Sequence, residues 1–391
     1  MRKNKIAFFA DILISDFDGA SRTMFQLINR IPADQFEFLF VCGMGPDNIA
    51  GFKCIRVSNL SIPGNEDYKV ALPMLQKNKL DEELELFEPD VIHISTPSML
   101  GNYALKAARR YEIPVISIYH TNFVSYIDYY LGKLPFLINL TKQKARNILN
   151  SFYNRCDKVY VPSESLAEEL VDGGMQSKLL KIWKRGIDRK LFSPSKKDKN
   201  LMKSLTGNDN PCILFVSRLV WEKNLQTMFN VYKLIEEKHL KYNFIVVGDG
   251  VAKDDAEKQM PNAFFLGHCD HEKLASVYAS ADVFFFPSVT ETFGNVVLEA
   301  MACGLPCVIA DGGGSRDFIT NAVNGFLCKS YDAQDFLNRI SSIIEQPELA
   351  RKLSCNGLES SKSYIWENLA DTYFGDLKLL SHTHRIPMLS V

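Results

Sequence analysis

The stretch that organises this sequence is SVTETFGNVVLEAMACGLP, residues 288–306. It reads as the end of a strand, a tight loop and a helix. Gly294 lets the backbone bend closely, and Asn295 is a favourable N-cap residue. Gly304 and then Pro306 end the helix. The stretch therefore predicts a strand-loop-helix unit whose helix is capped by Asn295.

Two carboxylates flank that predicted helix start. Glu291 precedes the cap. Glu299 follows it by four residues, which is roughly 6 Å along a helix axis at about 1.5 Å per residue. Because the free amides of a helix N-terminus bind anions, a phosphate at the cap would have Glu291 on one side and Glu299 on the other. That geometry suits a nucleotide diphosphate that carries a sugar.

Length and composition limit the possible functions. The chain has 391 residues, too many for one ordinary core, which predicts two domains. Its net charge is −1 and 23% of its residues are charged, so nothing indicates nucleic acid as a partner. Most of the nine cysteines lie in apolar runs, as reduced thiols of a cytoplasmic protein do. We find no signal peptide and no run of about 18 apolar residues, so we expect a cytoplasmic protein that does not span a membrane.

Short apolar runs alternate with longer amphipathic stretches, a pattern typical of parallel strands joined by crossover helices. The predicted strands of the first half are 5–10, 36–42, 91–94, 115–119 and 158–161. Those of the second half are 212–217, 243–247, 263–266, 283–287, 307–310 and 325–328. A polar, basic stretch at 188–203 separates the two series. We therefore expect two doubly wound α/β domains, residues 1–190 and 191–365, with a ligand in the cleft between them.

Two cations follow the first predicted strand of the second half. Arg218 and Lys223 fall in the loop after residues 212–217, where they would face the cleft of a doubly wound domain. One interpretation is a solvated basic loop. The other is a clamp for a leaving diphosphate, since an Arg fork and a Lys point charge both suit phosphate. The helix start in the same domain favours the clamp.

Several segments occur together in an order that one protein family shows. In the second half they are SRL at 217–219, EKN at 222–224, VGDG at 247–250 and the stretch from Glu291 to Glu299. They resemble the retaining, sugar-nucleotide-dependent glycosyltransferases of group 1, family four, with the GT-B fold. In the first half, residues 17–23, 119–123 and 182–188 are similar to the subgroup of GDP-mannose-dependent α-mannosyltransferases and sulfoquinovosyl-diacylglycerol synthases. The resemblance implies two Rossmann-like domains facing across a cleft.

The resemblance also implies roles for residues on both sides of that cleft. The backbone amides at Gly19 and Ala20 would approach the donor phosphates, and His120 would contact the transferred sugar near its 6-hydroxyl. Arg218 and Lys223 would hold the diphosphate and neutralise its charge as it leaves. Many members have two glycines where this chain has Gly19-Ala20, a difference that we interpret as subgroup variation.

At the predicted helix start the implied roles concern the donor. Glu291 would bind hydroxyls of the sugar, helped by the backbone amides of Phe293, Gly294 and Asn295. Glu299 would bind the ribose hydroxyls. Members of the family need no divalent metal, and this chain has no Asp-x-Asp motif in a suitable place, so we expect neither a metal nor another cofactor.

The implied function is transfer with retention of a hexose, mannose or glucose, from a nucleotide diphosphate to a hydroxyl of a lipid or lipid-linked glycan. The donor would be GDP-mannose or a UDP-hexose. The acceptor would attack from the side on which the diphosphate leaves. Two alternatives stay open: a sugar-nucleotide hydrolase or 2-epimerase of the same fold, and a nucleotide-sugar-binding protein without catalysis.

Residues 131–153 mix apolar side chains with Lys133, Lys142, Lys144 and Arg146. They indicate either a helix on the first sheet with a wet basic face, or a surface that contacts a membrane and reaches a lipid acceptor. In the second case the protein would sit peripherally on the inner face of the cytoplasmic membrane. The resemblance further implies that a helix at 366–382 packs back on the first domain. Four aromatic residues before 131 either line an acceptor groove or simply pack: Phe123, Tyr126, Tyr129 and Tyr130.

Other features have plainer interpretations. HCDH at 268–271 offers too few ligands for zinc and indicates a loop at a strand end. GDG at 248–250 lacks the last glycine of a nicotinamide-binding fingerprint. His93 either lines the cleft or is satisfied in the core. Asp317 stands where the family more often has Glu, and we assign no catalytic role to it.

Overall fold

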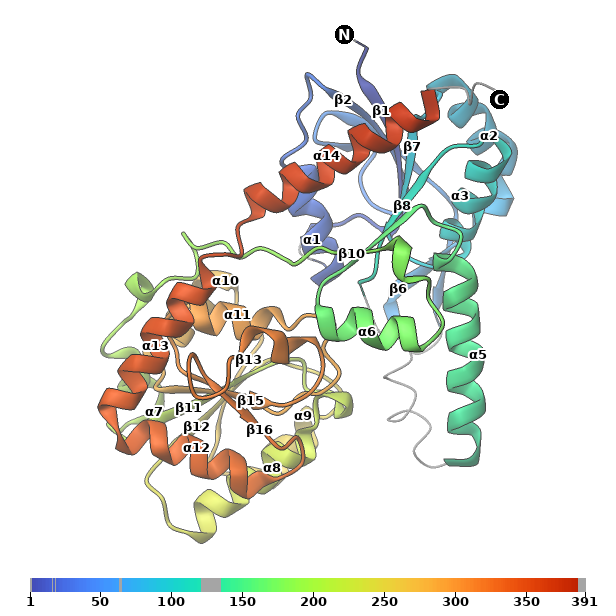
Figure 1. Cartoon of the computed structure of the whole chain (residues 1–391). Coiled ribbons are helices and arrows are strands. Elements are labelled where there is room, and N and C mark those ends of the chain that lie inside the picture. The colour runs from blue at the N-terminus through green and yellow to red at the C-terminus, as the bar shows by residue number, and fades with distance from the viewer. Residues whose placement is uncertain (1, 16, 18, 63–64, 121–134, 386–391) are drawn as a thin grey trace.

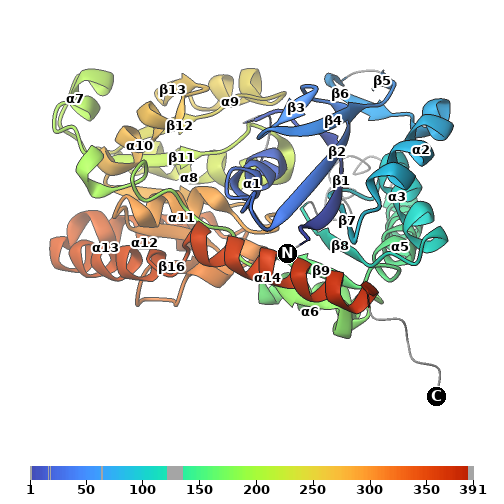
Figure 2. The same cartoon turned by 90° about the horizontal axis from the view of Figure 1, so that it is seen from above.

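The computed structural model describes residues 2–15, 17, 19–62, 65–120 and 135–385. It contains two large sheets, one in each half of the chain. Figure 1 shows the two α/β bodies one above the other, and Figure 2 shows the same arrangement from above. The predicted pair of doubly wound α/β domains is therefore confirmed.

The first sheet has eight strands in the order β10-β9-β8-β7-β1-β2-β4-β3, and all its pairs except β3–β4 are parallel. The strands are β1 (Asn4–Ile12), β2 (Phe36–Met44), β3 (Asn48–Ile49), β4 (Phe52–Arg56), β7 (Val91–Ile94), β8 (Val115–Ile118), β9 (Lys158–Val161) and β10 (Leu180–Ile182). A separate antiparallel hairpin consists of β5 (Asn59–Ile62) and β6 (Asn65–Ala71). The helices are α1 (Gly19–Ile28), α2 (Lys77–Phe87), α3 (Met99–Arg110), α5 (Pro135–Tyr153), α6 (Glu164–Asp172) and α14 (Trp366–Arg385), with 3-10 turns η1 (Pro73–Gln76) and η2 (Ser177–Leu179).

The second sheet has six parallel strands in the order β13-β12-β11-β14-β15-β16. They are β11 (Cys212–Val216), β12 (Asn243–Val247), β13 (Phe264–Gly267), β14 (Val283–Phe286), β15 (Cys307–Ala310) and β16 (Phe326–Cys328). The helices are α7 (Leu201–Thr206), α8 (Leu225–Glu237), α9 (Lys253–Gln259), α10 (His271–Ser280), α11 (Asn295–Ala302), α12 (Ala333–Glu345) and α13 (Pro347–Ser361). The 3-10 turns are η3 (Pro194–Lys196), η4 (Trp221–Lys223) and η5 (Gly314–Phe318).

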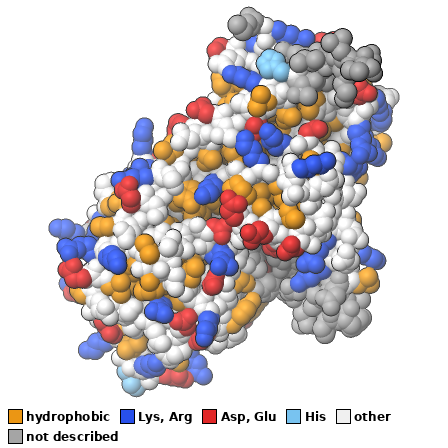
Figure 3. Space-filling model, viewed as in Figure 1, with side chains coloured by type: hydrophobic (Ala, Val, Ile, Leu, Met, Phe, Trp, Pro, Cys, Tyr) orange, Lys and Arg blue, Asp and Glu red, His pale blue; other side chains and the backbone are white. Residues whose placement is uncertain are grey.

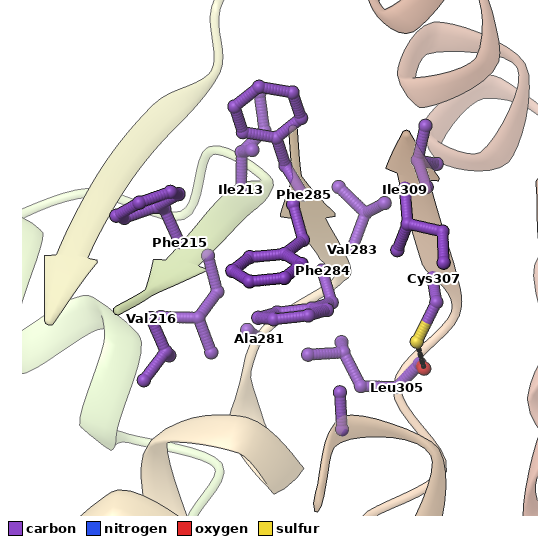
Figure 4. Packing of buried hydrophobic residues seen from close by; sticks show 14 of the residues in the cluster. Ile213, Phe215, Val216, Ala281, Val283, Phe284, Phe285, Leu305, Cys307 and Ile309 are labelled. Carbon is purple, nitrogen blue, oxygen red and sulfur yellow. Dashed lines mark hydrogen bonds between the residues drawn. The ribbon is translucent and has the colours of Figure 1, made fainter. Parts of the chain in front are cut away.

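The central strands read as continuous apolar runs because both faces of each parallel sheet are covered by helices. In β14 the ring of Phe284 packs against Tyr278 of α10 and the ring of Phe285 against Phe336 of α12, with centroid distances of 5.7 and 5.2 Å. Figure 4 shows these two phenylalanines among apolar side chains of the neighbouring strands. Burial on both faces thus fixes β14 at the centre of the sheet, and the loop that follows it carries Glu291.

Each of the eleven predicted strands matches a strand of the structure, with ends that differ by at most two residues. The predictions missed β3, β4, β5, β6 and β10. The first four connect β2 to α2, and β10 is a three-residue edge strand. The last strand of the first sheet ends at Ile182, and the first strand of the second sheet begins at Cys212. Residue 190, the predicted domain boundary, lies in the connection between these two strands.

The helix α14 lies on the first domain although it follows the second in sequence, as Figures 1 and 2 show. Its buried residues Trp366, Tyr373 and Leu377 join the same core as α1. The carboxylate of Asp376 accepts hydrogen bonds from Tyr160 and Lys181 at 2.5 and 2.7 Å. The chain therefore crosses between the domains twice.

These two crossings lie side by side. The backbone N–H of Ile187, on the first crossing, donates to the carbonyl of Tyr364, on the second, at 3.0 Å. Gly186 lies flat on the indole of Trp366, because a Cβ at Gly186 would come within 2.6 Å of the ring. Any rotation of one domain against the other must therefore bend these two connecting segments together.

The helix α5 packs one face on the first domain and exposes the other. Phe152 and Tyr153 lie in the core that also holds α2, α3 and α6. Leu140 and Ile148 are 56% and 66% exposed, and Lys144 is exposed too. The predicted aromatic residues Phe123, Tyr126, Tyr129 and Tyr130, and also Lys133, lie outside the described residues. Among the helices that the structure describes, none combines the length and the apolar character needed to cross a bilayer.

Candidate active site

The helix α11 begins at a strained turn. Its cap is Gly294, whose φ is 88°, and Asn295 is the first helical residue. The prediction that Asn295 caps the helix is therefore wrong by one residue, because the turn needs a left-handed backbone at the cap. A Cβ at Gly294 would also lie 2.6 Å from Cβ of Ser315. Glycine is required at the cap for both reasons. As predicted, the helix ends just before Gly304, whose φ is 73°.

Lys223 and Glu291 form a buried ion pair beside this helix start. The Nζ of Lys223 lies 2.5 Å from Oε1 of Glu291, which also accepts a hydrogen bond from Ser288 at 3.1 Å. The two loops that carry the pair are tied together, since the Thr290 hydroxyl donates to the carbonyl of Glu222 at 2.9 Å. The sequence predicts both residues as part of the site, but it does not predict that they contact each other.

The pKa of Glu291 lies below its ordinary value. Burial alone would raise the pKa. The charge and hydrogen bond of Lys223, the Ser288 hydroxyl and the charge of Arg218 lower it by more than burial raises it. Arg218 itself is exposed in the loop after β11. The site therefore holds an ionised carboxylate at neutral pH, with two cations around it.

The VGDG segment supports the loop that carries Arg218. The backbone N–H of Leu219 donates to the carbonyl of Asp249 at 2.8 Å. A Cβ at Gly248 would fall 1.8 Å from the carbonyl oxygen of Ser217, and its φ is 130°. These glycines let two loops pack backbone against backbone, which fixes the position of the Arg218 loop.

His120 lies where the two domains meet. Its carbonyl accepts hydrogen bonds from the Thr292 hydroxyl of the second domain at 3.1 Å and from Arg185 at 3.3 Å. Its ring is buried, and burial, followed by the charge of Arg185 and by His93, holds its pKa well below the ordinary value. The imidazole is thus neutral. The backbone of His120 contacts the loop that carries Glu291, because Thr292 directly follows Glu291.

Arg185 is a part of the site that sequence reasoning missed. Its side chain is buried, and its guanidinium lies 5.9 Å from the ring centroid of Phe293 as well as against the carbonyl of His120. The only signal was its position in the segment 182–188, directly after a strand end. Phe293 packs its own ring on Phe318 at 4.7 Å, so only its backbone can face a ligand.

The other predicted donor residues lie on both sides of the junction. Gly19 and Ala20 begin α1, and the Thr23 hydroxyl donates to the carbonyl of Gly19 at 2.9 Å. On the second domain Glu299 is buried and accepts a hydrogen bond from Tyr278 at 3.1 Å. Burial raises the pKa of Glu299, which the charge of Arg22, on α1, partly opposes. Through Arg22 the first domain thus acts electrostatically on a carboxylate of the second.

The remaining sequence motifs have structural roles. Asp270 of HCDH caps α10, and among the described residues no group of three or more His, Cys, Asp or Glu is arranged to hold a metal ion. His93 is in the core: its Nδ1 lies 3.0 Å from the Tyr373 hydroxyl, and burial lowers its pKa to about 3. Asp317 accepts hydrogen bonds at 3.2 Å from the N–H and hydroxyl of Ser165, across the two domains.

Polar atoms without a partner gather at this junction. Among the described residues, seven buried side-chain nitrogen or oxygen atoms have no hydrogen-bond partner. Five of them belong to residues around the site: Arg22 Nε, both ring nitrogens of His120, Asn295 Oδ1 and Ser315 Oγ. Because a buried polar atom without a partner is costly, this cluster indicates a place for a polar ligand.

Comparisons with known families agree with the fold and the motifs. The glycosyltransferase family 4 model matches residues 17–191, and the glycosyl transferases group 1 model matches residues 196–360. Sucrose-phosphate synthase from Thermosynechococcus elongatus superposes with a TM-score of 0.78 at 21% identity, over 97% of this chain and all of that one. The chain belongs to the group 1, family 4 glycosyltransferases and has their GT-B fold.

Two relatives place the chain more closely within that family. A GDP-mannose-dependent α-mannosyltransferase of Corynebacterium glutamicum is 27% identical over 99% of this chain and 92% of its own length. The sulfoquinovosyl transferase SQD2 of Arabidopsis thaliana is 29% identical over 82% of this chain and 62% of its own length. Both belong to the subgroup that the first-half motifs resemble.

Proposed function

We propose that this protein transfers a hexose, with retention of configuration, from a nucleotide diphosphate to a hydroxyl of a lipid or a lipid-linked glycan. The observation that carries the proposal is the cluster of unpartnered polar atoms around the Lys223–Glu291 pair, at the junction of two GT-B domains. Mannose from GDP-mannose is the preferred donor sugar, supported by the activity for which the Corynebacterium glutamicum relative is named, since that relative aligns over nearly the whole chain.

In the proposed reaction the second domain holds the leaving group. Arg218 and Lys223 would neutralise the negative charge that develops on the diphosphate when its bond to the sugar breaks, as donors in a water-excluded site do most effectively. Glu291 stays ionised and would accept hydrogen bonds from sugar hydroxyls. The Glu291 carboxylate also orients the Lys223 side chain, because the two form an ion pair.

The first domain would present the acceptor side. His120 is neutral and has two unpartnered ring nitrogens, so it can both donate to and accept from a sugar hydroxyl. The acceptor hydroxyl would attack on the face from which the diphosphate departs, and a phosphate oxygen would take its proton. Positioning and charge stabilisation then supply most of the acceleration.

We infer further that the reaction needs no divalent metal, because Lys223, Arg218 and the amides at α11 can carry the phosphate charge. Turnover should therefore persist in a chelator such as EDTA. A loss of turnover that added magnesium restores would contradict this part of the proposal.

A peripheral contact with the inner face of the cytoplasmic membrane is part of the proposal. It is supported by the exposed face of α5, where Leu140, Lys144 and Ile148 follow one another at intervals of four residues. Figure 3 shows Lys and Arg side chains along the edge of the first domain on the side of α5. Sedimentation with anionic and with zwitterionic vesicles tests the contact, and equal, negligible binding to both would refute it.

The test of the function is a donor screen. Purified protein is incubated separately with GDP-mannose, UDP-glucose, UDP-galactose and UDP-N-acetylglucosamine, first without and then with membrane lipid extract, and release of nucleoside diphosphate is measured. Release that requires lipid supports the proposal and identifies the donor. Release without lipid favours hydrolysis or 2-epimerisation, and binding without release favours a protein without catalysis. A Lys223→Met variant provides the background rate.

A further inference from the structure

Arg22 reaches from the first domain into the donor side of the second. It lies in the first turn of α1, and its Nη1 is 3.0 Å from Nε2 of His271, the first residue of α10. Because Arg nitrogens can only donate, the ring nitrogen of His271 would be the acceptor in this contact. A charged side chain of one domain is thus in contact with an imidazole of the other.

One N–H of the guanidinium lacks a partner. Nε of Arg22 is buried and makes no hydrogen bond with any described residue. The same side chain acts on Glu299, whose pKa its charge lowers against the effect of burial. A buried cationic N–H without an acceptor, on a side chain whose charge acts on a buried carboxylate, marks a position that an anionic ligand can fill.

Resting on the glycosyltransferase function proposed above, we propose that Arg22 donates its Nε–H to the nucleoside diphosphate part of the donor and so draws the first domain onto the nucleotide. The planar fork suits phosphate oxygens, for which one edge can offer two parallel N–H groups. Arg22 also stands one turn after the Gly19-Ala20 helix start, so amides and guanidinium face the same ligand from α1.

This role makes Arg22 a positioning residue that couples donor binding to domain closure. The nucleotide itself is held mainly by the second domain, through Glu299 and the start of α11. The contact from Arg22 adds affinity only when the two domains come together. Without donor, His271 holds the guanidinium in place between the two domains.

The experiment compares Arg22→Ala and Arg22→Lys with the wild type. Binding of UDP and GDP is measured by calorimetry, and compaction on adding each nucleotide by small-angle scattering. Loss of a charge-assisted hydrogen bond should raise the Kd of the preferred nucleotide about 10- to 100-fold in Arg22→Ala. Arg22→Lys keeps the charge but loses the fork, so it should bind with intermediate affinity. In both variants the nucleotide-dependent compaction should be lost or reduced.

Arg30→Ala is the matched control, since Arg30 follows the same helix but pairs with Glu367 at 2.9 Å, away from the donor pocket. It should bind and compact like the wild type. Thermal unfolding without nucleotide identifies any variant that fails to fold, and Arg22→Lys then carries the test. Wild-type affinity and compaction in folded Arg22 variants would overturn the inference alone. A wild type that binds neither nucleotide would overturn the proposed function, and the inference with it.

Discussion

Replacing Lys223 with methionine isolates the ion pair at the centre of the site. Lys223 is 6% exposed, and its Nζ lies 2.5 Å from the Glu291 carboxylate. At an effective dielectric constant of about 20, two unit charges 2.5 Å apart attract each other by roughly 7 kcal/mol. Removing both ions from water costs several kcal/mol each, so the intact pair adds little net stability. Breaking it, however, leaves a buried carboxylate without its main partner.

We therefore expect Lys223→Met to lower the free energy of unfolding by about 3 kcal/mol, the low end for a broken buried pair. The low end applies because the Ser288 hydroxyl and the charge of Arg218 still stabilise Glu291. The double variant Lys223→Met with Glu291→Gln should recover most of that loss, because no unpaired charge remains. Turnover should fall at least about 100-fold in both, and in Glu291→Ala as well, since removing one transition-state donor has that effect.

Urea unfolding of the wild type, the single variants and the double variant, together with nucleoside diphosphate release, measures both effects. The reasoning about the pair is refuted if Lys223→Met is as stable as the wild type, or if the double variant loses the sum of the single losses. Near-normal turnover in both Lys223→Met and Glu291→Ala would refute the assignment of the site itself.

Three further predictions concern separate parts of the structure. Because burial raises the pKa of Glu299, the wild type loses stability as pH rises through that pKa. Glu299→Gln should therefore match the wild type near pH 4 and exceed it near pH 8 in urea unfolding, while binding nucleoside diphosphate more weakly. Gly294→Ala should lower the free energy of unfolding by about 2–4 kcal/mol, because of the positive φ and the contact with Ser315. Gly207→Ala should lower it by about 1 kcal/mol, because Gly207 has a φ of 74° but open space around it. Equal losses in the two variants would contradict the effect of crowding by Ser315. Asp376→Asn should speed amide hydrogen exchange in α14 and leave α12 unchanged, because the Asp376 carboxylate joins Lys158 and Lys181 to that helix; unchanged exchange in α14 would contradict it.

The elements predicted correctly are those whose pattern is set locally. Runs such as Val283–Phe286 are apolar throughout because helices cover both faces of the sheet, and this burial is visible in the sequence. The strands β5 and β6 were missed because their sequences, NLSI and NEDYKVA, are half polar and form a hairpin outside both large sheets. The start of α11 was misplaced by one residue, because N-cap preference favours Asn295 while the backbone turn demands Gly294.

The site residues that belong to a recognisable motif were predictable, and those whose role depends on contact between segments distant in sequence were not. Lys223 and Glu291 stand in recognisable motifs, although 68 residues separate them. Arg22 and Tyr278 were missed because nothing near them in sequence shows that they approach Glu299. The role of Arg22 arises only when the two domains are brought face to face, whereas that of Tyr278 arises from the packing of α10 against α11 within the second domain.

The position of α14 determines when the first domain can be completed during biosynthesis. The last strand of the first domain ends at Ile182. The helix α14, which covers Tyr160 and Trp183, begins at Trp366, about 180 residues later. At about 5–20 residues per second, a ribosome needs roughly 10–40 s to make that intervening chain. During this interval the whole second domain can fold while an apolar face of the first waits, open to water. We therefore expect chaperones to bind the nascent first domain, and the N-terminal half to be the last part of the enzyme to reach its final state.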